Sequence, residues 1–255
     1  MIRSSKNILL TLSLISIFTG FLGCSFNAEK ITADKSISSI IQMAAKAQAA
    51  KRYKQAGDLY MKVDELYPYS DESRQALLEA MKSYHAGSEL TEARVAAKKY
   101  LILYENGEGA AFAKYMIGLS HFDAIVDVQR DQGSASFAVK EFSELISKYP
   151  DTDEAAKATK KLEVAFAQLA GQEMSVGRYY LQRQHYLAAT RRFQTVVDTY
   201  SDTIFAVEAF YRLAEAYFAL GMRPEFEMTK SILIERFPDS KWTLMVRELP
   251  SLPEP

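Results

Sequence analysis

The sequence predicts an all-α fold, a right-handed solenoid of five stacked helix pairs with one long linking helix. Two observations support this prediction. A short phrase that begins with an aromatic residue recurs five times, and each copy closes one segment with helical apolar periodicity before another begins. In addition, the segment from Asp153 to about Leu181 has apolar residues at helical spacing and contains no proline. It predicts a single helix of about 28 residues.

The copies of the phrase are 37, 45, 51 and 37 residues apart, and they begin at Tyr67, Tyr104, Tyr149, Tyr200 and Phe237. The second helix of a unit has a small residue followed four positions later by a ring, as in Ala56 with Tyr60, Ala138 with Phe142 and Ala189 with Phe193. Residues four apart share one helical face, so the partner helix can approach at the alanine and pack against the ring. This pattern resembles the tetratricopeptide repeat. The polar segment from about Val126 to Ser136 predicts a loop inside the third pair.

The first residues of the chain predict a lipoprotein signal peptide over residues 1–23. Arg3 and Lys6 precede an apolar segment from Ile8 to Leu22, and Cys24, the only cysteine in the sequence, follows directly. Acyl chains on this cysteine would anchor the protein to a membrane without a spanning helix. An ordinary secretory signal followed by an unmodified cysteine is the alternative.

The remaining boundaries follow from composition. Residues 24–35 are polar, lack helical periodicity and predict a lipidated tether. The five-repeat domain is expected over residues 36–249. Residues 250–255 contain three prolines and predict a non-helical tail.

Charge and motif content exclude several functional classes. Residues 1–23 contain two of the 31 Lys and Arg residues, which leaves 29 against 32 Asp and Glu, and the signs are interspersed. This balance excludes a nucleic-acid-binding surface. The three histidines, 36 and 64 residues apart, lack the spacing of a helical metal site, and no nucleotide-binding or nucleophile motif occurs. We therefore expect no catalytic residue, no cofactor and no metal, and the chain is predicted not to be an enzyme. The histidines are His85, His121 and His185.

Several stretches carry a resemblance to a known family. They are Tyr67 to Ser70, Tyr115 to Leu119, Asp127 to Gln132, and Glu173 to Tyr180 continuing through Arg183, Tyr186, Ala188, Ala189, Arg192 and Phe193. Together with the leader, these stretches resemble the BamD family, lipoproteins of the bacterial outer-membrane β-barrel assembly machine, in its α-proteobacterial form. The resemblance implies a lipid-anchored scaffold on the periplasmic face of the outer membrane.

The resemblance also implies partners. A BamA-like, barrel-forming subunit would bind the C-terminal repeats, unfolded outer-membrane proteins would bind the N-terminal repeats, and other lipoproteins of the machine would associate. Arg192 matches a family arginine on the surface that faces the barrel subunit. It precedes the expected core residue Phe193 and so points away from the core, and Arg183 is expected on the same surface.

A groove for unfolded substrates is expected on the first two units, where tyrosines are frequent. Any tyrosine that is not part of the core could stack on aromatic-rich barrel segments. The candidates are Tyr53, Tyr60, Tyr67, Tyr69 and Tyr84.

Two other classes of protein share such repeats. A periplasmic scaffold or cell-division coordinator would usually have an N-terminal coiled coil, and the region before Ser36 is too short for one. A pilus-assembly lipoprotein would have more regular spacing, without the insertion and the long linking helix.

Overall fold

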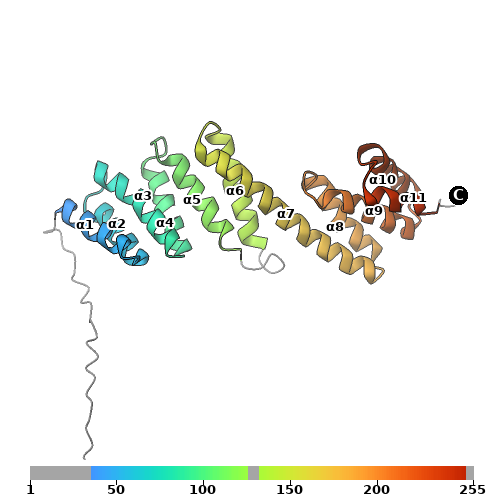
Figure 1. The fold of residues 1–255 in the computed structure, drawn as a ribbon, viewed down its shortest axis with the longest axis horizontal. Helices are drawn as coiled ribbons and strands as arrows, with labels where there is room; N and C mark the ends of the chain where they lie inside the picture. Colours follow the sequence, from blue (N-terminus) through green and yellow to red (C-terminus); the bar gives the residue numbers. More distant parts are fainter. Residues whose placement is uncertain (1–35, 126–131, 251–255) are drawn as a thin grey trace, which may run out of the picture. The chain divides into compact units, whose positions relative to one another are not determined.

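The computed structural model describes residues 36–125 and 132–250. The predicted signal peptide, the tether with Cys24, and the tail beyond Pro250 lie outside these residues. The regular structure of the described residues is entirely helical (Figure 1). Its eleven helices are α1 (Ile37–Ala49), α2 (Tyr53–Leu66), α3 (Asp71–Ala86), α4 (Leu90–Leu103), α5 (Ala110–Phe122), α6 (Gln132–Lys148), α7 (Asp153–Gln182), α8 (Tyr186–Thr199), α9 (Ala206–Leu220), α10 (Arg223–Arg236) and α11 (Lys241–Glu248).

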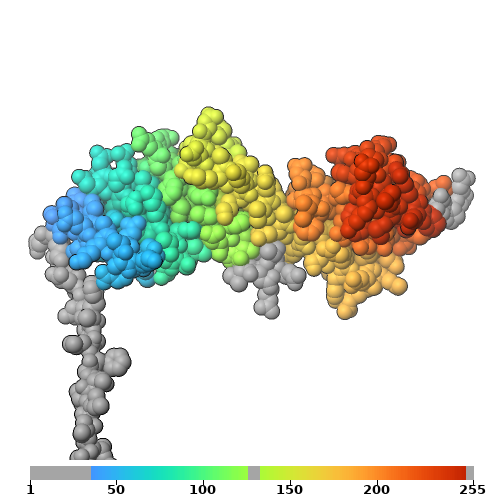
Figure 2. Space-filling view, viewed as in Figure 1, coloured from blue at the N-terminus to red at the C-terminus, as the bar shows by residue number. Residues whose placement is uncertain are grey.

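The helices form five antiparallel pairs, from α1 with α2 to α9 with α10, and each helix up to α10 also packs against its neighbours in sequence. In Figure 2 the N-terminal units, coloured blue to green, pack directly against one another. The predicted all-α, repeat-like solenoid is therefore confirmed. The five predicted pairs are followed by α11, which packs on α9 and α10 and whose N-cap is the side chain of Ser240.

The recurring aromatic phrase forms a turn with a repeated hydrogen bond. A hydroxyl group three residues after the aromatic residue donates to its carbonyl oxygen, at 2.8 to 2.9 Å, in the pairs Ser70 to Tyr67, Thr152 to Tyr149 and Thr203 to Tyr200. The hydroxyls of Ser70 and Thr152 also accept from the first turns of α3 and α7. In these two copies the phrase therefore ends one helix and caps the next.

The predicted pairs of small and large residues lie in the core. Ala189 and Phe193 are fully buried, as are their counterparts Ala138 and Phe142 in α6. Glycines of the preceding helices permit this packing. A Cβ atom on Gly177 would lie 2.5 Å from the Phe193 ring. The two helices of a pair are therefore in contact at the glycine.

Helix α7 confirms the predicted long helix, with 30 residues and a length of about 45 Å. It packs against α5 and α6 of the preceding pair, against its own partner α8, and against α9 of the following pair. This single helix therefore belongs to both halves of the solenoid (Figure 1). Of the helices in the described ranges, none combines the length and hydrophobicity required to cross a membrane.

The predicted loop over residues 126–136 is partly wrong, because α6 begins at Gln132. Ala135 and Ala138 are fully buried, three residues apart, so the apolar face of the helix already begins inside the segment assigned to the loop. Residues 126–131 lie outside the described part of the chain.

Candidate functional site

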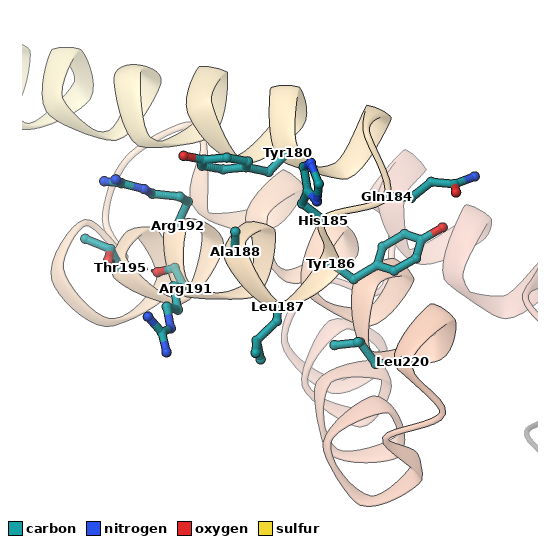
Figure 3. A pocket seen from close by; sticks show the side chains of 10 residues that line it. All are labelled: Tyr180, Gln184, His185, Tyr186, Leu187, Ala188, Arg191, Arg192, Thr195 and Leu220. Atoms are coloured by element: carbon teal, nitrogen blue, oxygen red, sulfur yellow. Dashed lines mark hydrogen bonds between the residues drawn. The ribbon is translucent and has the colours of Figure 1, made fainter.

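A pocket of about 710 Å³ lies where α7 ends and α8 begins, with the end of α9 on its other side (Figure 3). Its lining residues come from these three helices and from the turn between α7 and α8. They are Tyr180, Gln184, His185, Tyr186, Leu187, Ala188, Arg191, Arg192, Thr195 and Leu220.

The turn that forms one wall of this pocket has a defined backbone structure. Gln184 adopts a left-handed conformation with φ of 61°. The N–H groups of Gln184 and His185 donate to the carbonyl oxygens of Leu181 and Tyr180, at 3.0 and 2.9 Å. Because Phe193 of α8 is fully buried against α7, the residues on the opposite side of α8 face the pocket.

Arg192 has an intramolecular partner that the sequence did not predict. Its Nη1 atom donates to both carboxylate oxygens of Glu173 in α7, at 3.1 and 3.3 Å. The side chain of Arg192 is 43% exposed and that of Glu173 is 14% exposed. Arg192 does point away from the core, as expected, but α7 holds its side chain in place.

The pairing with Glu173 leaves one edge of the Arg192 guanidinium open. Within the described part of the chain, Nε and Nη2 of this residue make no hydrogen bond. These two atoms form the side of the guanidinium that binds both oxygens of a carboxylate. Arg192 can therefore keep its salt bridge to Glu173 and at the same time donate hydrogen bonds to a second carboxylate.

The pocket is positively charged. Arg191 and Arg192 line it, and none of its ten lining residues is Asp or Glu. Figure 3 shows Arg192 extending toward α7 and Arg191 pointing away from it. Sequence analysis missed Arg191, although its position four residues after the exposed Leu187 places both on one face of α8.

Arg183, the other predicted partner-binding arginine, does not line this pocket, so the structure does not bring the two arginines into one site. It follows the last residue of α7, and its guanidinium lies over the ring of Tyr179, at 4.6 Å from the centroid. The ring holds the side chain on the helix surface one turn back. Arg183 is not among the residues that line the pocket.

Two of the five candidate tyrosines belong to the core. The hydroxyl of Tyr60 donates to Gln48 at 3.1 Å, and that of Tyr84 donates to Asp58 at 2.8 Å. Both rings are buried, and burial followed by the hydrogen bond to Asp58 raises the pKa of Tyr84. These rings cannot contact a substrate while the repeats are folded, so they are removed from the candidate groove.

The other three tyrosines differ in accessibility. Tyr53 and Tyr67 are half-buried. Tyr69 is 75% exposed and lies in the turn between α2 and α3 with φ of 65°. Tyr69 is therefore the candidate whose ring is most open to a ligand.

The histidines have different environments. Nε2 of His85 lies 2.9 Å from a carboxylate oxygen of Asp123, and His121 stacks on Phe137 with ring centroids 5.1 Å apart. Burial, with a contribution from Arg94, lowers the pKa of His121. In the described ranges, no group of three or more His, Cys, Asp or Glu residues is arranged to hold a metal ion.

Comparison with known proteins identifies the family. A family model described as "Outer membrane lipoprotein" (YfiO) matches residues 33–233. A protein of Caulobacter vibrioides named outer membrane protein assembly factor BamD is 30% identical over 235 residues, which cover 91% of this chain and 77% of the relative. The chain belongs to the BamD family.

Other members of the BamD family are similarly related. The BamD protein of Rickettsia prowazekii is 33% identical over 192 residues, which cover 75% of this chain and 76% of the relative. That of Neisseria meningitidis is 29% identical over 247 residues, and 92% of each chain is covered. These relatives are named assembly factors, which agrees with the prediction of a chain that is not an enzyme.

Proposed function

We propose that this chain is a lipid-anchored scaffold subunit of the machinery that assembles β-barrel proteins in the outer membrane. Its BamD relatives bear the name of outer membrane protein assembly factors. In this proposal the pocket between α7 and α8 binds the barrel-forming, BamA-like subunit. The observation that carries the proposal is the open edge of Arg192, held by Glu173 in a pocket lined by no acidic residue.

The arrangement of Arg192 favours binding because little has to be ordered when a partner arrives. The salt bridge to Glu173 restricts the side chain, and the fully buried Phe193 fixes the helix beneath it. Such preorganisation lowers the entropy lost on association. Truncating one member of a desolvated charge pair costs ~2–5 kcal/mol of binding free energy. Because Arg192 is partly exposed, we expect the cost for this residue to lie near the lower value.

Titration of the barrel subunit's periplasmic domains with this protein tests the proposal. Arg192→Gln retains a donor for Glu173 but removes the charge, and we expect the dissociation constant to rise at least ~10-fold. Lys160→Gln is the matched control, because Lys160 is exposed on α7 and does not line the pocket. Equal affinities for wild type and Arg192→Gln would reject this role of the pocket.

For the N-terminal units we propose contact with unfolded outer-membrane proteins. Tyr69 is the most exposed candidate, and Tyr53 and Tyr67 contribute the accessible parts of their rings. Aromatic stacking tolerates many sequences, which suits a surface that receives different barrel proteins. Cys24 would anchor the scaffold to the periplasmic face of the membrane beside the barrel subunit and the other lipoproteins of the machine.

A further inference from the structure

Two large apolar side chains in the α7–α8 pocket are exposed without an obvious structural reason. Leu187, in the first turn of α8, is 59% exposed, and Leu220, the last residue of α9, is 37% exposed. A single exposed leucine is ordinary. Here two leucines from successive repeats line the same pocket as Arg191 and Arg192.

The backbone holds both leucines in defined positions. Leu220 is followed by Gly221, whose left-handed conformation, with φ of 71°, ends α9. The N–H groups of Gly221 and Met222 donate to carbonyl oxygens one turn back, at 3.1 and 3.0 Å. Leu187 is fixed by the burial of Ala189 in the same turn of α8. An apolar subsite is therefore present before any partner binds.

The charges near the leucines define the second part of the site. Glu173 partly compensates the charge of Arg192, whereas Arg191 is exposed and has no ion-pair partner among the described residues. Arg191 also borders a neighbouring hollow that contains Asp198, whose carboxylate accepts a hydrogen bond from Gln194 at 2.8 Å. The uncompensated charge in the pocket is thus positive.

We propose that this pocket is a two-part docking site for a segment of the partner protein that presents an acidic residue and a large apolar residue on the same side. The inference rests on the proposed function and specifies what the pocket recognises. The acidic side chain would bind the open edge of Arg192 under the attraction of Arg191, and the apolar side chain would lie between Leu187 and Leu220.

The composition of the pocket disfavours other occupants. A basic segment would be repelled by two arginines. A segment without an acidic residue would remove water from Arg192 and supply no replacement for its hydrogen bonds. A purely acidic segment would leave the leucine surfaces exposed to water. Only a segment with both features satisfies both parts of the pocket.

The two subsites differ in their response to salt, and this difference forms the test. The full chain in detergent is titrated with the periplasmic domains of the barrel subunit at low and high ionic strength. Leu187→Ser and Leu220→Ser should each weaken binding about tenfold, equivalent to ~1.4 kcal/mol, at both salt concentrations. Arg191→Gln should weaken binding mainly at low salt, because its effect is long-range and screened. Val164→Ser, at an exposed position of α7 outside the pocket, is the control.

The outcomes separate this inference from the proposed function. If Arg192→Gln weakens binding and neither leucine variant does, the barrel subunit binds the pocket but the apolar subsite is refuted. If none of the three variants weakens binding, both proposals fail. A photo-crosslinker at position 187 identifies the occupant by mass spectrometry. We expect a segment with Asp or Glu within four residues of a large apolar residue, and a segment lacking either feature would overturn the inference.

Discussion

A methyl group added at Gly177 should destabilise the protein when Phe193 is present. It should stabilise the protein when Phe193 is replaced by alanine. Gly177 lies inside α7, and a Cβ atom there would be 2.5, 2.8 and 2.9 Å from three atoms of the Phe193 ring. The ring is fully buried in a cluster that includes Met174, Ala189 and Val196. Because buried side chains are closely packed, the added methyl is expected to overpack the core.

The magnitude follows from two opposing effects of Gly177→Ala. Overpacking costs ~1–3 kcal/mol, and a fully enclosed ring places the cost near the upper value. Replacing glycine by alanine inside a helix contributes about 1 kcal/mol in favour of folding. We therefore expect a net loss of about 2 kcal/mol. Phe193→Ala alone should cost ~3–5 kcal/mol. In that background the clash is absent, so Gly177→Ala should stabilise the protein by about 1 kcal/mol.

Urea unfolding of the four proteins in this cycle measures the coupling, which should be about 3 kcal/mol. Repeat arrays can unfold in parts, so hydrogen exchange of α7 and α8 should localise the effect. Gly171→Ala is the control in the same helix, because its Cβ atom would lie no closer than 3.2 Å to the ring of Phe205. The same effect of Gly177→Ala with and without Phe193 would refute the proposed packing.

Two further predictions concern a buried hydroxyl and the lipid anchor. Tyr84→Phe removes the hydrogen bond to Asp58 and should lower the free energy of unfolding by ~1–2 kcal/mol at neutral pH. Because the pKa of Tyr84 is raised in the folded state, the wild type should lose stability as the pH rises above about 10. The decrease in the free energy of unfolding over this pH range, measured by chemical denaturation, should be smaller for Tyr84→Phe. Equal decreases in the two proteins would contradict this role of the hydroxyl. Cys24→Ala should abolish metabolic labelling with palmitate, whereas retained label would reject acylation at Cys24.

The sequence was sufficient for the helices because their signals are local. The absence of proline and the apolar spacing from Asp153 onward predicted α7, and the buried small and large residues were predicted from their positions four apart. The error at α6 has a local cause as well. A polar segment and the polar first turn of an amphipathic helix look alike in sequence, and only the burial of Ala135 distinguishes them.

The candidate site was harder to predict because it depends on how helices are rotated against one another. Glu173 and Arg192 are 19 residues apart on different helices, and no periodicity brings them together. Which tyrosines are buried also depends on how neighbouring helices pack. Tyr60 occupies the large position after Ala56 and could have been assigned to the core, but the burial of Tyr84 arises from a close approach to Gly57 of the neighbouring helix.

Site-specific photo-crosslinking in cells tests most directly whether the two ends of the chain have different partners. A crosslinking residue at Thr195, in the α7–α8 pocket, should capture the barrel-forming subunit, and one at Tyr69 should capture unfolded barrel substrates. A third at Lys160, exposed on α7 and outside the pocket, provides the background. The proposed division of roles would be contradicted if Thr195 captured the barrel subunit no more strongly than Lys160 does. It would also be contradicted if unfolded substrates were captured at Thr195 and not at Tyr69.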